Sequence, residues 1–413
     1  MIYETNFDTL HYKNWGLEMQ NGFFGIYEKG RAESVFLDYP PLYLFFLNIV
    51  GMLYNSFPVL SEVGGLNMLV IKFFPVVFDL ACAWVLYVIC RRHSEWTGLL
   101  AAVLWLLNLS QFFNTSIWGQ TDQTMAFVLL ISFSLYEQKK PLPATLMFAV
   151  ACLTKFQCLF FAPVILSELF FRHGFKKLLT SVGCGLALAL AVFIPFMIGA
   201  GDILLPLRIY LMGLIKYPFY TMNACNIYGM FGLNFTLIPP NDIFGLARTD
   251  ILSLALKFIV VAGIFVLYKF TRRHSIWIAA MLSVQCIFML TTRMHERYQI
   301  IAIPFALMAF IRLKQKRFFW LYISLSIVTF INQALVLFDH NGGMTAWSGL
   351  FEPMIVAVSA LNFVLFIFSM VIGLRYLLSG SSKDNATGTG DESSETAPDG
   401  VEITNGAPLP NYQ

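Results

Sequence analysis

Two aspartates near the start of the chain are candidates for a general base. Asp8 lies in the segment NFDTLHYKNW, and Asp38 opens the segment DYPPLYL. An ionised carboxylate can remove the proton of a hydroxyl group that attacks a substrate. Aspartate is also favoured at helix N-caps and in turns, so both residues have a structural interpretation as well. The residues alone leave the two interpretations open.

Basic residues in two other segments could bind a phosphate group. The segment TTRMHERYQ contains Arg293, His295 and Arg297, and each of these side chains can carry positive charge. Arginine binds phosphate through two parallel hydrogen bonds. Lys155, in LTKFQ, is a lone cation between two apolar runs, where a charge tends to face a cavity or a partner. Ordinary charge at a membrane surface, and snorkelling of Lys155, are the alternatives.

Further polar and aromatic side chains near these segments could bind the hydroxyl groups of a sugar. Trp118 could instead anchor the chain at a membrane interface, and Asp122 could cap the following helix. The candidates for binding a sugar or an acceptor are Trp118, Gln120, Asp122, Gln157, Asn223, Asn226 and Glu296.

Apolar helices must position these segments. Hydrophobic residues make up 58% of the 413 residues and charged residues only 12%, whereas a soluble domain carries about 25% charged residues. The net charge of +3 gives no indication of nucleic-acid binding. We therefore expect an all-α, polytopic transmembrane helix bundle with juxtamembrane helices on its outer side. About eleven spans are predicted, at residues 68–90, 97–113, 124–136, 143–154, 156–171, 179–199, 251–268, 276–290, 299–313, 318–338 and 353–376.

The distribution of basic residues predicts the orientation of the bundle. With eleven spans, the short loops rich in lysine and arginine all fall on one side, which should be cytoplasmic. Residues 1–67 then form an outer N-terminal loop, 68–378 the transmembrane domain and 379–413 a disordered cytoplasmic tail. The run 39–57 is apolar enough to cross the membrane, but this orientation makes it an interfacial helix on the outer side. With this orientation, a helix upstream of Met1 is expected to anchor and orient the N-terminus of the chain.

Two charged residues inside the first predicted span support a competing interpretation. Asp79 and Lys72 could serve a secondary transporter, which binds its substrate near the middle of the membrane. A contact between helices would explain them equally well. The seven cysteines form no CxxC pair and no metal-ligand spacing, so we interpret them as small buried apolar residues.

Five blocks of the sequence together resemble the GT-C superfamily of glycosyltransferases. They are DYPPLYL, WGQTD, LTKFQ, YPFYTMNACNIYGMFGLN and TRMHERY, and the resemblance covers residues 8 to 300. Within it, the chain resembles bacterial proteins related to the GPI mannosyltransferases. It differs from many of these relatives at Phe156, where they have proline.

The resemblance implies an inverting transfer of a hexose, mannose or glucose, from a polyprenyl-phosphate donor to a glycan or glycolipid acceptor. Asp8 takes the position of the general base, and Asp38 orients it or the acceptor. His295 and Arg297, supported by Arg293 and Lys155, would stabilise the leaving phosphate. No metal and no cofactor is expected, and membrane lipid surrounds the bundle. The expected location is a bacterial plasma membrane with an extracytoplasmic site, or the endoplasmic reticulum with a lumenal one. A transporter or lipid-linked glycan flippase is the alternative.

Overall fold

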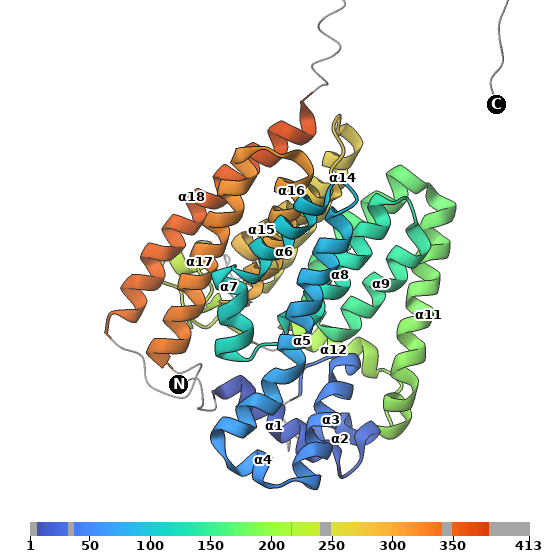
Figure 1. Cartoon of the computed structure of the whole chain (residues 1–413), viewed down its shortest axis with the longest axis vertical. Helices are drawn as coiled ribbons and strands as arrows, with labels where there is room; N and C mark the ends of the chain where they lie inside the picture. The colour runs from blue at the N-terminus through green and yellow to red at the C-terminus, as the bar shows by residue number, and fades with distance from the viewer. Residues whose placement is uncertain (1–5, 32–36, 216, 240–248, 341–348, 380–413) are drawn as a thin grey trace, which may run out of the picture.

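The computed structural model describes residues 6–31, 37–215, 217–239, 249–340 and 349–379. Long helices run side by side as a bundle, and a group of N-terminal helices packs against one end of it (Figure 1). Almost all of the regular structure is helical, as the composition predicts. The N-terminal group comprises α1 (Phe7–Met19), η1 (Phe23–Gly25), α2 (Ile26–Arg31), α3 (Pro41–Ser56) and α4 (Val59–Glu62), where η denotes a 3₁₀ or π turn.

The bundle contains the remaining elements and one short pair of strands. In chain order these are α5 (Gly64–Cys90), α6 (Glu95–Leu106), α7 (Leu109–Phe112), η2 (Phe113–Trp118), α8 (Asp122–Glu137), α9 (Pro141–Thr154), η3 (Phe156–Phe161), α10 (Ala162–Glu168), η4 (Leu169–His173), α11 (Phe175–Gly199), α12 (Leu205–Ile215), β1 (Thr221–Met222), α13 (Ile227–Met230), α14 (Thr249–Phe270), α15 (Ile276–Leu290), β2 (Met294–His295), η5 (Tyr298–Ala302), α16 (Ile303–Leu313), α17 (Lys316–His340) and α18 (Phe351–Leu378).

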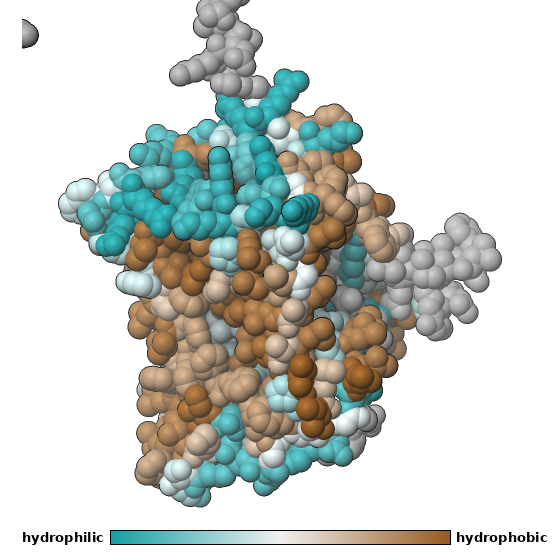
Figure 2. Space-filling view, turned by 90° about the vertical axis from the view of Figure 1, so that its right-hand side faces the viewer, coloured by the Kyte–Doolittle hydropathy of each residue, from teal (hydrophilic) through white to brown (hydrophobic). Residues whose placement is uncertain are grey.

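The surface has the pattern of a membrane protein. A broad apolar band lies between hydrophilic regions at the two ends of the molecule (Figure 2). Among the described residues, four helices are long and apolar enough to cross a membrane: α5, α11, α17 and α18. The pair Glu95–Leu106 and Leu109–Trp118, bent by 51°, would make a fifth span. The prediction of eleven spans is therefore not confirmed.

Breaks in the helices explain part of this difference. The predicted span 156–171 consists of η3, α10 and η4, and the predicted span 299–313 consists of η5 and α16. Pro163 and Pro304 each lie in the first turn of the α-helix that follows a 3₁₀ turn. Proline is well tolerated at that position because its missing N–H would have no partner inside the helix. The apolar composition of these ranges does not reveal such breaks.

The first helix begins with a capping box. The side chain of Asn6 accepts a hydrogen bond from the backbone N–H of Thr9 at 3.1 Å, and the hydroxyl of Thr9 accepts one from the N–H of Asn6 at 3.0 Å. These reciprocal bonds fix the start of α1. Asp8, in the first turn, is therefore not the cap and is free to point elsewhere.

Helix α3 forms from the run 39–57 and lies directly against α1. Pro41 is its first residue, and its 16 residues are too few for it to count among the spans. The backbones of α1 and α3 touch at two glycines, because a Cβ atom on Gly51 would lie 1.9 Å from the carbonyl oxygen of Gly16. The interfacial position of α3 and the three-part domain division remain predictions. Nearly all of the predicted tail, from residue 380, lies outside the described residues.

Both charged residues of the first predicted span make contacts within the protein. The ammonium group of Lys72 donates to the carbonyl oxygens of Ser116 at 3.0 Å and Ile117 at 2.8 Å. Asp79 accepts a hydrogen bond from the indole N–H of Trp105 at 2.9 Å. These contacts join α5 to η2 and α6, which favours the structural interpretation of both residues.

Candidate active site

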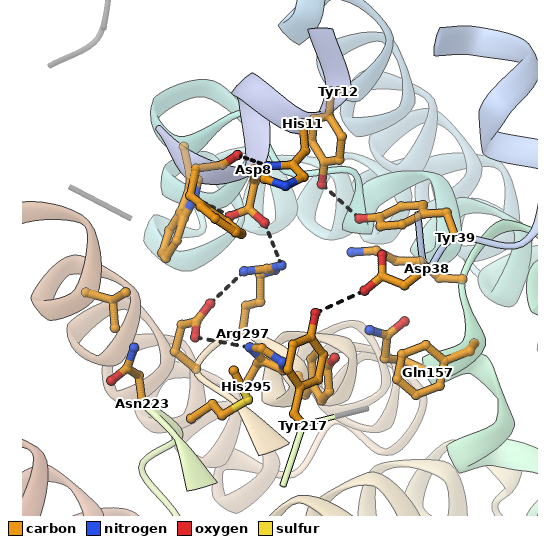
Figure 3. Close-up of a pocket in the computed structure, with 18 of the residues that line it drawn as sticks. Asp8, His11, Tyr12, Asp38, Tyr39, Gln157, Tyr217, Asn223, His295 and Arg297 are labelled. Atoms are coloured by element: carbon orange, nitrogen blue, oxygen red, sulfur yellow. Dashed lines mark hydrogen bonds and ion pairs between the residues drawn. The ribbon is translucent and has the colours of Figure 1, made fainter. Parts of the chain in front are cut away.

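A cavity of about 290 Å³ lies where the N-terminal helices meet the bundle (Figure 3). Aromatic side chains make up much of its wall, and charged groups converge on its centre. The predicted site residues that line it are Asp8, Asp38, Trp118, Lys155, Gln157, Asn223, His295, Glu296 and Arg297. The predicted residues Arg293, Gln120, Asp122 and Asn226 are not among its lining residues.

Asp8 is held by three donors. Its Oδ1 atom accepts from Nη2 of Arg297 at 3.2 Å, and its Oδ2 atom accepts from the side-chain amide of Gln120 at 2.7 Å and from the indole of Trp118 at 3.2 Å. Figure 3 shows the carboxylate of Asp8 directly above the guanidinium of Arg297. Both carboxylate oxygens thus accept hydrogen bonds, and these bonds fix the orientation of the group.

A π turn and a glycine place two of these donors. The turn η2 ends at Trp118, and Gly119 follows with φ +89°, a conformation that disfavours other residues. The side-chain amide of Asn6 donates to the carbonyl of Trp118 at 2.9 Å, which ties this turn to the start of α1. The WGQTD block therefore positions Trp118 and Gln120 beside Asp8.

Asp38 lies on the opposite wall and contacts a tyrosine that the sequence analysis did not select. The hydroxyl of Tyr217 donates to Oδ2 of Asp38 at 3.1 Å, and the tyrosine ring packs edge-on against His295, with ring centroids 5.0 Å apart. Burial and the neighbouring carboxylate of Asp38 raise the pKa of Tyr217, so its hydroxyl keeps its proton. The sequence offered one signal for Tyr217, which is its position as the first residue of the block YPFYTMN.

The two-residue strands join two distant blocks of the sequence. Strand β1 pairs in parallel with β2, so that Thr221 lies opposite Met294 and Met222 opposite His295. Arg293 has φ +66° and donates from its guanidinium to the carbonyl of Tyr217. Arg293 therefore holds the loop that carries Tyr217, and the prediction that it binds the donor phosphate gains no support from this geometry.

His295 is not a cation at neutral pH. Burial, together with the charges of Arg297 and Lys155, lowers the pKa of His295 to about 3. The sequence shows that His295 can carry charge but does not show its burial, which favours the neutral form. The role of His295 at the donor phosphate stays a prediction. As a neutral imidazole, His295 can still donate one hydrogen bond.

Arg297 is shared by two carboxylates and an aromatic ring. Its Nη1 donates to Glu296 at 2.6 Å, its Nη2 donates to Asp8, and its guanidinium carbon lies 5.7 Å from the centroid of the Trp118 ring. Burial raises the pKa of Glu296 despite the nearby guanidinium. The only charged donor that reaches Asp8 among the described residues is Arg297.

Lys155 is buried in an ion pair and does not snorkel. Its ammonium group lies 2.5 Å from Asp122, which also accepts from Asn114 at 3.0 Å. Burial opposes the charge on Lys155, but the adjacent carboxylate of Asp122 outweighs it and raises the pKa of Lys155. The ammonium group also lies 5.5 Å from the ring centroid of Tyr39.

Two other predicted residues have structural contacts. The side chain of Asn226 accepts from the backbone N–H groups of Tyr228 and Gly229, both at 3.1 Å, and so caps α13. Gln120 supports Asp8 from outside the cavity and accepts from the hydroxyl of Tyr12 at 3.1 Å. The cavity residues that the sequence analysis did not select include His11, Tyr12, Tyr39 and Tyr217, although each lies in or beside a segment that it singled out.

The chain was compared with known proteins. Residues 38–198 match the family model of the dolichyl-phosphate-mannose-protein mannosyltransferases. No curated protein matches the chain. The matched segment includes DYPPLYL, WGQTD and LTKFQ, and it confirms the resemblance to the GT-C superfamily. The comparison therefore indicates a membrane glycosyltransferase of the GT-C type.

Proposed function

We propose that this chain transfers a mannosyl group, with inversion, from a polyprenyl-phosphate donor to a glycan or glycolipid acceptor. The contact between the Asp8 carboxylate and the Arg297 guanidinium inside the cavity is the observation that carries the proposal. It provides, side by side, a base for the acceptor and a cation for the leaving phosphate. The name of the matching family favours mannose.

Both oxygens of Asp8 are engaged as long as Arg297 and the two neutral donors hold the carboxylate. An acceptor hydroxyl must then compete with these donors for the carboxylate oxygens. A donor phosphate offers Arg297 an alternative anion with suitable geometry for bidentate binding. When Arg297 turns to that phosphate, Oδ1 of Asp8 is released and can accept the hydroxyl group of the acceptor.

The reaction then proceeds as a single displacement. Asp8 takes the proton of the acceptor hydroxyl, and the oxygen forms a bond to the anomeric carbon from the face opposite the phosphate. The bond between that carbon and the phosphate oxygen breaks, and polyprenyl phosphate leaves with the electron pair. Arg297 stabilises the negative charge that develops on the phosphate, a contribution that is often the largest in catalysis. Lys155 adds to the positive potential, and His295 donates as a neutral imidazole.

Asp38 is a second candidate for the base. The single polar contact recorded for its carboxylate within the described part of the chain is the hydrogen bond from Tyr217. Within the described residues, Asp38 therefore has no ion pair like the one that joins Asp8 to Arg297. We assign Asp38 the role of orienting the acceptor, because no arginine paired with it could turn from it to a phosphate.

The proposal extends to the arrangement in the membrane. Eleven spans, some built from broken helices, would place the basic loops in the cytoplasm and the cavity on the extracytoplasmic side. A bacterial plasma membrane is the proposed location, with the endoplasmic reticulum as the alternative.

A transfer assay tests the reaction class and the donor. Membranes holding the protein are supplied with radiolabelled polyprenyl-phosphate mannose or glucose and a crude pool of lipid and glycan acceptors. Asp8→Asn is compared with Asp202→Asn, a control that neutralises a carboxylate paired with Arg208 outside the cavity. Transfer of mannose by the wild type and the control, but not by Asp8→Asn, is expected. Equal transfer by all three proteins would contradict the proposal.

A further inference from the structure

A second cavity, of about 410 Å³, lies at the other end of α8 from the candidate active site. It is formed where the C-terminal ends of α8 and α16, the turn η4 and the start of α15 come together. Its acidic and basic lining residues are Glu137, Lys139, Glu168, Arg172 and Arg312, and two histidines, His173 and His274, lie among them. None of these residues has a part in the proposed transfer.

Both carboxylates of this cavity already have partners. Glu168, which is buried, lies 2.7 Å from Nε2 of His274 and 3.9 Å from Nε2 of His173. Glu137 accepts from the guanidinium of Arg312 and, at 3.1 Å, from the indole of Trp277. The acidic side chains are therefore engaged by groups of the cavity wall.

Two cations of the same cavity have no such partner. No hydrogen bond or ion pair is recorded for the side chains of Lys139 and Arg172 within the ranges that the structure describes. A nitrogen atom of a neighbouring side chain, Nε of Arg312, is buried and has no hydrogen-bond partner among the described residues. Unsatisfied buried donors are costly and call for an explanation. A ligand that accepts several hydrogen bonds and carries negative charge would satisfy all of these groups.

Backbone geometry adds to the preference for an anion. Helix α15 starts at this cavity, and its first residues, Ile276 and Trp277, are among the lining residues. The N-terminal end of a helix presents free N–H groups and a partial positive charge. The π turn η4 carries Arg172 and His173 into the same wall, and such turns are often found at functional sites.

We propose that this cavity binds a phosphate group, with Arg172 and Lys139 as its charged ligands. Two sources of the phosphate are compatible with the geometry, an anionic phospholipid headgroup and a small soluble phosphate. The lipid is favoured by the surroundings, because Phe170 and Phe171, in the same turn as Arg172, are 42% and 36% exposed and pack with Phe265. Basic pockets between membrane helices are known to bind such headgroups.

Purified full-length protein is tested for the ligand directly. The double variant Lys139→Gln/Arg172→Gln removes the two exposed cations, for which no ion pair is found within the described ranges. The control Lys316→Gln/Arg317→Gln removes two exposed cations that do not line the cavity. Native mass spectrometry measures retained phosphatidylglycerol and phosphatidylcholine, and thermal unfolding measures stabilisation by inorganic phosphate. Unfolding temperatures without ligand show whether each variant is folded.

We expect binding to be at least about 10-fold weaker in the cavity variant than in the wild type and the control, because charge-assisted bonds are the strong ones. Preferential retention of phosphatidylglycerol identifies the lipid headgroup as the ligand, and saturable stabilisation by phosphate alone identifies a soluble one. Equal binding by the folded cavity variant and the wild type would overturn the proposal. Equal loss in both variants would also do so, since it would indicate general surface charge.

Discussion

In the proposed reaction, Arg297 links binding of the donor phosphate to the release of Asp8. It contacts Asp8 and Glu296 at once and lies over the Trp118 ring, so its planar fork is fixed in orientation. A lysine in its place would keep the charge but could not bridge two carboxylates in one plane. The proposal that Arg297 leaves Asp8 and binds a phosphate depends on the planar shape of the guanidinium.

Arg297→Lys should therefore slow transfer by about 100- to 1,000-fold, the range seen when one preorganised transition-state donor is removed. The loss should fall on kcat at saturating donor, because the lysine still attracts the phosphate. Initial rates over a range of donor concentrations measure this. A rise in KM with an unchanged kcat would contradict the role assigned to the guanidinium.

His295 should make the protein sensitive to acid. Its pKa is about 3 in the folded chain, below the ordinary value of 6.5, so the unfolded chain binds a proton that the folded chain does not between those pH values. The contribution of the neutral His295 to the free energy of unfolding is fully present above about pH 6.5 and is lost as the pH falls towards 3. His295→Gln should flatten this dependence by up to about 1.4 kcal/mol per pH unit. Unfolding temperatures from pH 4 to 7 test it, and parallel curves for variant and wild type would refute it.

Residue types and motifs were sufficient to select Asp8, Asp38 and Arg297 from the sequence. The neutral state of His295 could not be predicted, because it results from burial beside two cations far apart in the chain. Arg293 and Asn226 were selected for their chemistry, yet the fold uses them to hold a loop and to cap a helix. Polar residue type indicates the region of a site more reliably than it indicates the role of each member.

At the scale of elements, the crossing of α1 and α3 determines where Asp8 lies. The two backbones meet at Gly16 and Gly51, and the side-chain amide of Gln20 donates to the carbonyls of Gly16 at 3.0 Å and Asn48 at 3.1 Å. Small residues allow such close approach between helices. Any side chain at the crossing would push α1, and Asp8 with it, away from the bundle.

Gly51→Ala should destabilise the protein by about 1–3 kcal/mol or more, as overpacking does. Gly183→Ala is the matched control, since it lies within α11 and a Cβ atom there meets nothing within 4 Å. The unfolding temperature and the transfer rate should both fall in Gly51→Ala alone. Equal unfolding temperatures for the two variants would show that the crossing tolerates a methyl group.

The sequence predicted the existence of most helices but not their interruptions. Hydrophobic runs gave α5, α11, α17 and α18 close to their observed limits. The turns η3 and η5 pack against elements that are distant in the sequence. No local periodicity of hydrophobic residues reveals these turns. The β1–β2 pairing was also beyond prediction, because two residues per strand carry no alternating pattern.

At the scale of the whole molecule, the two cavities lie at opposite ends of α8. If the bundle crosses the membrane as proposed, a substrate reaches one cavity from outside and the phosphate site faces the cytoplasm. The apolar band of Figure 2 between two hydrophilic ends agrees with this arrangement.

Cysteine labelling tests this arrangement. Glu62→Cys, at the end of α4, and Lys176→Cys, at the start of α11, are exposed positions in a chain from which the exposed Cys184 is removed. A maleimide that cannot cross membranes should label them from opposite sides of sealed vesicles. Labelling of both from the same side would contradict the proposed orientation.

The most direct test of the central claim is the rate of mannosyl transfer by Asp8→Asn at saturating donor, with Asp38→Asn measured alongside. If Asp8 is the base, its replacement should lower kcat by about 100- to 10,000-fold while the donor still binds. Asp38→Asn should retain more activity than Asp8→Asn. Near wild-type turnover in Asp8→Asn, or a larger loss in Asp38→Asn, would contradict the assignment and move the base to the opposite wall of the cavity.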